Sequence, residues 1–97
     1  MYLIRNVFIA KPGSAGKLAK LMKEVAQAMN DPSAKVYLDF VTDFNKIVME
    51  HQVPSLGDYE KNMDEFKKKT SPELAEKMKN YTELYQTGYR EIYKIVD

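Results

Sequence analysis

The sequence has no cysteine, a single histidine, and only four glycines and four prolines among its 97 residues. Without cysteine the chain can form neither disulfides nor thiolate metal sites. A single histidine, His51, cannot supply the several imidazole ligands that many catalytic metal centres take from one chain. The composition therefore predicts no metal site and leaves acid–base chemistry to carboxylates, tyrosines, basic side chains and His51.

A strong net charge and long apolar runs are missing as well. The formal net charge is +1, so no electrostatic attraction to nucleic acid or to an anionic membrane is expected. No apolar stretch is long enough to span a bilayer, and the N-terminus lacks the charged and apolar regions of a signal peptide. These absences predict a cytoplasmic protein with neither a membrane nor a nucleic acid as its partner.

The residues that are present have the composition of an ordinary globular domain, 44% hydrophobic and 30% charged. A chain of 97 residues can build one small core but not two. The sequence also shows no internal repeat, low-complexity tract or linker. Residues 1–97 are therefore predicted to form a single domain.

The clearest local signal is a strand that turns directly into a capped helix, within residues 45–60. Apolar side chains fall on one face of residues 46–53, as in a half-buried strand. Pro54 ends this strand because it cannot donate a ladder hydrogen bond. Ser55 can then cap a helix over residues 56–68, with Asp58 near the positive end of the helix dipole.

Similar patterns predict the remaining elements. Residues 2–10, 35–42 and 89–96 are rich in β-branched and aromatic side chains and are predicted to be strands. A helix is predicted over residues 15–29 after an N-cap at Ser14, and a further helix begins at Ser71 and Pro72 and ends near Gly88. Residues 43–45 form the turn that pairs the two middle strands as an antiparallel hairpin.

The predicted order is strand, helix, strand, strand, helix in two pieces, strand. This order is typical of an α+β fold of the ferredoxin-like type, in which helices cover one face of a four-stranded antiparallel sheet. On this reading one core lies under the helices. The side chains expected to be almost completely buried in it are Leu21, Val25, Phe40, Met49, Met63 and Met78.

The opposite face of the predicted sheet lacks helices but still carries large apolar side chains. A contiguous patch of this kind is rare on soluble monomers, and a second copy of the chain is the commonest way to cover it. The sequence therefore predicts a homodimer closed through its sheets. The residues assigned to this open face are Leu3, Val7, Ile9, Val41, Val48 and Ile92.

The chain resembles a known superfamily in the order of its elements and in two short segments. The first strand ends in Lys11-Pro12-Gly13, and the third runs into V-P-S-L-G-D-Y-E from Val53 to Glu60. These features resemble the dimeric α/β-barrel superfamily, and within it the antibiotic-biosynthesis-monooxygenase-like and NIPSNAP-like small proteins. The resemblance implies a homodimer whose sheets close into a barrel around a cavity. It also implies an activity among cofactor-free oxygenases, haem-degrading enzymes and isomerases, or none that is assigned.

Four polar side chains share the open face by alternation: Arg5, Tyr37, Asp39 and Glu50. In a ligand site, Arg5, Tyr37 and Glu50 would bind the molecule, Arg5 by fixing an anionic or carbonyl oxygen. Glu50 or Asp39 would then accept a proton as the catalytic base. The alternative is an ion-pair network that neutralises its own charges across a dimer interface. Both readings place Arg5 within ion-pair distance of Glu50 or Asp39.

His51 is the remaining catalytic candidate, and alternation places it on the apolar face of its strand. A histidine there serves either as a hydrogen-bonded core residue or as a proton acceptor in a pocket. Haem-binding relatives use a histidine ligand, so haem is the alternative to an expectation of no cofactor.

Three functions compete on the sequence alone. The first is a cofactor-independent monooxygenase or an isomerase that acts on a small apolar metabolite in the barrel cavity. The second is a non-catalytic dimer that binds a small molecule or has a structural role. The third is RNA binding, which ferredoxin-like sheets also perform. The chain lacks the aromatic and basic strand motif typical of that third class.

Overall fold

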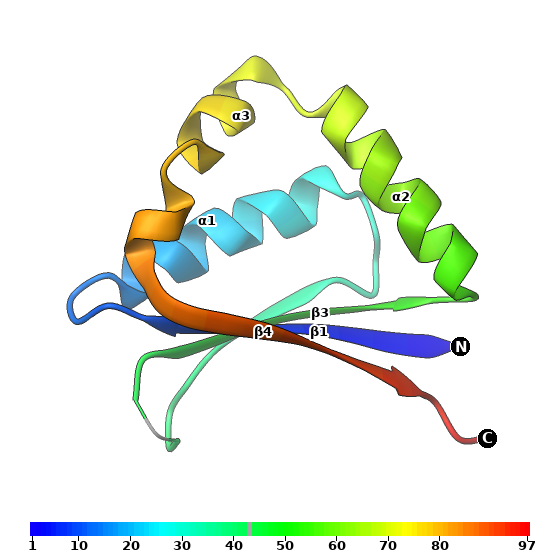
Figure 1. Ribbon diagram of the computed structural model, residues 1–97, viewed down its shortest axis with the longest axis horizontal. Helices are drawn as coiled ribbons and strands as arrows, with labels where there is room; N and C mark the ends of the chain where they lie inside the picture. Colours follow the sequence, from blue (N-terminus) through cyan, green and yellow to red (C-terminus); the bar gives the residue numbers. More distant parts are fainter. Residues whose placement is uncertain (43) are drawn as a thin grey trace.

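The computed structural model describes residues 1–42 and 44–97. Its elements are β1 (Tyr2–Ala10), α1 (Ala15–Ala28), β2 (Lys35–Leu38), β3 (Lys46–Val53), α2 (Leu56–Lys69), α3 (Pro72–Met78), the 3-10 helix η1 (Tyr81–Leu84) and β4 (Tyr85–Lys94). Figure 1 shows these helices on one side of the sheet, with the other side uncovered. The predicted ferredoxin-like α+β fold is confirmed.

The described strands form one four-stranded sheet in the order β2-β3-β1-β4. All three pairings are antiparallel, and β1 lies in the centre between β3 and β4. In the register of β1, Arg5 lies opposite Glu50 on one side and opposite Glu91 on the other. Residues that lie opposite each other in a sheet share a face, so this register decides which side chains meet.

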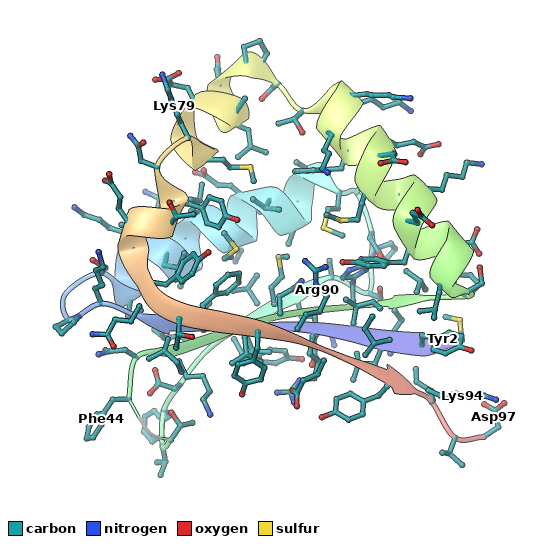
Figure 2. All side chains as sticks on the ribbon, in the orientation of Figure 1. Tyr2, Phe44, Lys79, Arg90, Lys94 and Asp97 are labelled. Atoms are coloured by element: carbon teal, nitrogen blue, oxygen red, sulfur yellow. The ribbon has the colours of Figure 1, made fainter. Side chains whose placement is uncertain are left out.

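The hairpin between β2 and β3 differs from the prediction. β2 ends at Leu38 instead of residue 42, and the chain then leaves the sheet in a loop in which Phe44 and Asn45 have positive φ angles. Phe40 is 98% exposed and Val41 is 84% exposed, so the predicted burial of Phe40 and the sheet position of Val41 are wrong. Figure 2 shows Phe44 at the tip of this hairpin, away from the helices. Asp43, part of the predicted turn, lies outside the described residues.

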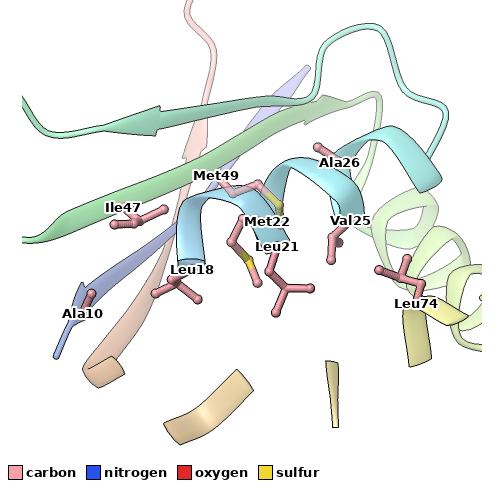
Figure 3. Packing of buried hydrophobic residues seen from close by; sticks show 9 residues of the cluster. All are labelled: Ala10, Leu18, Leu21, Met22, Val25, Ala26, Ile47, Met49 and Leu74. Atoms are coloured by element: carbon pink, nitrogen blue, oxygen red, sulfur yellow. The ribbon is translucent and has the colours of Figure 1, made fainter. Parts of the chain in front are cut away.

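The core lies between α1 and the sheet, as Figure 3 shows. Burial confirms Leu21, Val25 and Met49 as core residues, whereas Met63 and Met78 are only partly buried. The buried cluster consists of Ala10, Leu18, Leu21, Met22, Val25, Ala26, Ile47, Met49 and Leu74. The fully buried helical part of the core therefore comes mainly from α1. Leu74 is the buried contribution of α3, and Phe66, Met78, Tyr81 and Leu84 pack against the cluster while partly buried.

The last strand begins at Tyr85, four residues earlier than predicted, so Gly88 lies inside β4 and not at a helix end. Gly88 is paired with Phe8 of β1, and a Cβ atom at Gly88 would lie 3.2 Å from both Phe8 Cδ1 and the Val7 carbonyl oxygen. Glycine thus fits a close approach between neighbouring strands, where a side chain would crowd Phe8 and the Val7 carbonyl. The same register pairs Ile92 with Ile4. Ile92 therefore lies on the helix-facing side of the sheet, and its predicted position on the open face is wrong.

The predicted N-cap at the start of α2 is confirmed. Ser55 has an extended backbone and its hydroxyl accepts a hydrogen bond from the Asp58 N–H at 3.1 Å. The hydroxyl of Ser71 caps α3 in the same way, through the N–H of Leu74. Ser14 occupies the N-cap position of α1 without a side-chain cap bond in this fully described segment.

Candidate functional site

A cavity of about 880 Å³ lies between the sheet and the helices of the chain. Residues from β1, β3, β4 and all the described helices line it. Metabolite sites are typically about 300–1,000 Å³, so the volume suits a small organic molecule. The polar set predicted from the sequence belongs to the open face, whereas this cavity lies on the helix-covered face.

Most of the cavity wall is apolar and adaptable. Methionine side chains have several rotatable bonds and a polarisable sulfur, so they fit ligands of varied shape. Tyrosine and phenylalanine rings add flat apolar surface at the same wall. The apolar and aromatic side chains concerned are Met22, Val25, Met29, Met49, Met63, Phe66, Met78, Tyr81 and Tyr85.

His51 supplies a buried polar group to this cavity. His51 comes from β3 and is 2% exposed, and its ring is tilted by 43° to the Tyr59 ring at 5.8 Å between centroids. The Nδ1 atom is fully buried and makes no hydrogen bond with any described residue. Burial lowers the pKa of His51, Asp31 opposes that shift, and Arg90 adds to it. His51 is therefore neutral at pH 7 and able to accept a proton.

Arg90 stands beside His51 at the cavity wall. It comes from β4, and its Nε atom donates a hydrogen bond to Asn6 Oδ1 at 2.6 Å. The guanidinium carbon lies 5.6 Å from the centroid of the Tyr59 ring, the distance of a cation–π contact. Figure 2 places Arg90 on the side of the sheet that faces the helices. A fixed cation beside a neutral imidazole suits a ligand oxygen that becomes negative when its proton leaves.

Asp31 approaches His51 from the turn between α1 and β2. Its Oδ2 atom lies 3.7 Å from His51 Nδ1, too far for a hydrogen bond but within ion-pair range. The other oxygen, Oδ1, accepts hydrogen bonds from the backbone N–H and the hydroxyl of Ser33, at 2.8 and 2.7 Å. The sequence analysis missed both Asp31 and Arg90. The Asp-Pro-Ser segment signals a turn, but nothing in it places the turn beside His51.

The predicted polar set lies on the other face of the sheet. Arg5 Nε is 3.4 Å from Glu50 Oε2, which confirms the predicted ion pair. Arg5 also donates from Nη1 to Glu91 Oε1 at 3.2 Å, a partner that the sequence analysis did not identify. Tyr37 donates its hydroxyl proton to Glu50 at 3.0 Å, and Tyr93 donates to Glu91 at 2.7 Å. A row of paired polar side chains therefore crosses all four strands, in the order Tyr37, Glu50, Arg5, Glu91 and Tyr93.

For the two tyrosines of this row, the hydrogen bond to a glutamate changes the pKa more than burial does. The hydrogen bond to Glu50 raises the pKa of Tyr37, and the hydrogen bond to Glu91 raises the pKa of Tyr93. Asp39 does not join the row but lies just beyond β2, where it accepts a hydrogen bond from the hydroxyl of Thr42. The catalytic candidates from the sequence are Arg5, Asp39, Glu50 and His51. Of these four, His51 alone lines the cavity of about 880 Å³. The roles assigned to Arg5, Asp39 and Glu50 stay predictions.

The described residues form neither a candidate metal site nor a membrane-spanning helix. Among the described side chains, no three histidine, cysteine, aspartate or glutamate residues are placed to hold a metal ion. Within residues 1–42 and 44–97, no helix has the length and apolar character needed to cross a membrane.

The element order, the one-sided helix layer and the sheet topology define the chain as a ferredoxin-like α+β domain. No family model matches the chain. No curated protein matches it in sequence.

Solved structures share this fold. A NIPSNAP family protein from Agrobacterium tumefaciens is 11% identical, with a TM-score of 0.80 over 99% of this chain and 93% of that one. A NIPSNAP-like domain protein from Burkholderia xenovorans is 14% identical, with a TM-score of 0.77 over 98% and 84%. An antibiotic biosynthesis monooxygenase is 14% identical, with a TM-score of 0.66 over the whole of both chains. The expected structural resemblance is thereby confirmed at the level of the fold.

Proposed function

We propose that the protein is a homodimer that binds a small, largely apolar metabolite in the cavity between sheet and helices, and oxidises it without a cofactor. The observation that carries this proposal is the cavity of about 880 Å³, with methionine and aromatic walls and with His51 and Arg90 at its surface. An apolar wall combined with a few convergent polar groups is the usual form of a metabolite site.

The chemistry follows from the protonation states of these two residues. Neutral His51 takes a proton from the substrate, and the Arg90 guanidinium stabilises the negative oxygen that results. The electron-rich anion then reduces O₂: a CH₂ group becomes C=O, with one oxygen atom entering the product and the other leaving as water. Because the substrate supplies all four electrons that reduce O₂ to the carbonyl oxygen and water, the reaction needs no resident cofactor. An isomerase would use the same proton acceptor and return the proton to another atom.

The open sheet face supports the homodimer. Three half-exposed tyrosines, Tyr37, Tyr89 and Tyr93, lie on it around the buried Val7 and Val48. Arg5, at the centre of the ion-pair row, is itself only about one-third exposed. A second sheet packed on this face would cover the tyrosine rings and close the barrel. The sedimentation coefficient at micromolar concentration tests this part, and a clean monomer contradicts it.

Oxygen uptake tests the proposed reaction. The purified protein is mixed with a panel of phenols, hydroquinones and enolisable ketones, and dissolved oxygen is followed with an electrode. We expect uptake with at least one compound, loss of that uptake in His51→Gln, and retention in Tyr93→Phe, which changes the open face only. Uptake that is unaffected by His51→Gln would show that the reaction occurs elsewhere.

A non-catalytic binding or structural dimer is the second candidate. The observation that favours it is the completeness of the Tyr37–Glu50–Arg5–Glu91–Tyr93 row, whose polar groups satisfy one another without a ligand. In that case equilibrium dialysis detects binding of a panel compound, but no oxygen is consumed. If no panel compound binds, the structural dimer is the version of this candidate that is left, and a clean monomer in sedimentation would contradict it.

Two further assignments belong to this proposal. The cytoplasm remains the proposed compartment. Haem is the alternative to the cofactor-free reaction, because His51 is the one imidazole that the chain could offer to iron. Titration with hemin decides this point: an absorbance change that is lost in His51→Gln would favour haem.

A further inference from the structure

The turn that carries Asp31 is fastened to β3 at the residue next to His51. The backbone N–H of Gln52 donates a hydrogen bond to Ser33 Oγ at 2.9 Å. The Ser33 hydroxyl in turn donates to Asp31 Oδ1. Since β2 begins only at Lys35, Ser33 occupies the place at which a longer β2 would pair with β3. A chain of two hydrogen bonds therefore ties the Asp31 carboxylate to the strand that carries His51.

The two oxygens of Asp31 have different partners. Oδ1 is held by Ser33, while Oδ2 is the atom that points to His51 Nδ1 across 3.7 Å. Nδ1 is fully buried and has no hydrogen-bond partner among the described residues. A buried donor or acceptor without a partner destabilises the folded state. Asp31 Oδ2 is thus a ready acceptor beside a buried nitrogen that lacks a partner.

We propose that Asp31 is the positioning residue for His51: its Oδ2 accepts the Nδ1 proton, which fixes the imidazole with the Nε2 lone pair free to take a proton from the ligand. The 3.7 Å gap between Oδ2 and Nδ1 must shorten for this bond to form, and hydrogen bonds at catalytic sites are often long before a ligand is bound.

Three side chains face the imidazole, and their effects differ. Asp31, from the turn after α1, favours the imidazolium that forms when Nε2 takes a proton. Arg90, from β4, disfavours that cation but favours a negative ligand oxygen. Tyr59, from α2, contributes a ring face to both His51 and Arg90. Asp31 thus stabilises the protonated imidazole, and Arg90 stabilises the negative ligand oxygen. Proton abstraction requires both effects.

The pair of Asp31 and His51, called the dyad below, also limits the class of ligand. This conclusion about the ligand rests on the proposed function. A ligand must present a group that ionises by losing a proton, either O–H or C–H beside a carbonyl, so that Nε2 gains the proton and Arg90 meets the oxygen. Simple hydrocarbons lack such a group, and the Arg90 guanidinium repels a permanently cationic ligand. The site is therefore predicted to select weak acids with apolar bodies.

The tautomer of His51 tests the positioning role directly. Because the chain has one histidine, its two imidazole nitrogens can be assigned without ambiguity in a ¹⁵N NMR spectrum. At a pH where the ring is neutral, we expect the proton on Nδ1 in the unaltered protein. In Asp31→Asn the new amide group can donate to Nδ1, so the proton should move to Nε2 and the pKa of His51 should fall.

A matched control is available at the other end of the sheet. Asp39→Asn makes the same chemical change in a loop and should leave the His51 spectrum unchanged, because Asp39 bonds to Thr42 instead. If Asp31→Asn does not fold, Ser33→Ala serves in its place: it keeps the carboxylate but removes the hydroxyl link, and should give a mixture of both tautomers. An Nε2–H tautomer in the unaltered protein overturns the proposal. So does an Nδ1–H tautomer that stays unchanged in both Asp31→Asn and Ser33→Ala.

The same spectra separate this inference from the proposed function. Addition of a panel phenol that binds should shift the Nε2 resonance toward the imidazolium position in the unaltered protein. An Nδ1–H tautomer that responds to Asp31→Asn supports the positioning role even if oxygen uptake is absent with every compound. Oxygen uptake with an Nε2–H tautomer would support the function and overturn the dyad.

Discussion

Glu50 and Glu91 bind the same guanidinium, although they lie on β3 and β4, which the central strand β1 separates. Glu50 Oε2 is 3.4 Å from Arg5 Nε, and Glu91 Oε1 is 3.2 Å from Arg5 Nη1. The register places Arg5 directly opposite both acids. One cation therefore holds two anions on a sheet face where each side chain is between about one-quarter and one-third exposed, 34% for Arg5, 23% for Glu50 and 33% for Glu91.

Replacing this shared cation should destabilise the fold. Arg5→Met keeps the apolar length of the side chain but leaves Glu50 and Glu91 near each other without a counter-charge. Partly exposed ion pairs contribute about 0.2–1 kcal/mol each, and two are lost here. We expect the free energy of unfolding to fall by about 0.4–2 kcal/mol, measured by urea denaturation at pH 7.

The control for this prediction removes the two acids first. In a Glu50→Gln, Glu91→Gln background, Arg5→Met breaks no ion pair, so its effect should shrink to a few tenths of a kcal/mol. An equal loss in both backgrounds would mean that Arg5 stabilises the sheet through packing alone.

Two serine N-caps offer a second test, because only one of them makes a cap bond. Ser55→Ala removes the hydroxyl that accepts the Asp58 N–H at the start of α2, and should cost about 1 kcal/mol. Ser14→Ala changes the equivalent position of α1, where the side chain makes no cap bond. It should stay within about 0.5 kcal/mol. Equal losses in urea denaturation would contradict the difference between the two caps.

Two glycines make a third test with opposite signs. Gly88→Ala would force a methyl group to within 3.2 Å of Phe8 and the Val7 carbonyl, and should destabilise by about 1–3 kcal/mol. Gly16→Ala lies in α1 with no atom within 4 Å of the new methyl group. It should stabilise by about 0.4–1 kcal/mol, because alanine restricts the unfolded chain. A neutral Gly88→Ala would show that β1 and β4 can separate without cost.

Local signals account for what the sequence predicted well. The junction of β3 and α2 follows from Pro54 and Ser55, each of which acts within a few residues of itself. The Arg5–Glu50 pair follows from alternation, because two neighbouring strands with known faces leave few choices. Fold class needed only the order of such elements.

Properties of the assembled chain account for what was missed. Phe40 alternates correctly with Val36 and Leu38, but its burial depends on whether β2 continues, and β2 ends at Leu38. Gly88 looks like a helix end, yet the nearness of Phe8 explains why glycine stands there. Asp31 and Arg90 reach His51 from a turn and from β4, and only tertiary structure brings them together. The sequence predicted one residue of the cavity site, His51, and not its neighbours.

The burial of His51 predicts how stability depends on pH. Its pKa in the folded state is lower than the ordinary value of 6.5, chiefly because burial disfavours the charged ring. The unfolded chain therefore binds a proton more readily than the folded chain does. The stability that the neutral ring contributes is fully present above pH 6.5, and it is lost as the pH falls from 6.5 through the folded-state pKa.

A comparison of two proteins isolates this effect. Urea denaturation between pH 8 and pH 5 should give a steeper loss of stability for the unaltered protein than for His51→Gln, in which every other titrating group is kept. The difference in slope cannot exceed about 1.4 kcal/mol per pH unit, the limit for one proton. Above pH 7.5 the two curves should run parallel, because the imidazole is then neutral in both the folded and the unfolded chain. If the curves are parallel throughout, the folded state holds His51 with an ordinary pKa, and the ring is not the buried neutral base that the cavity chemistry requires.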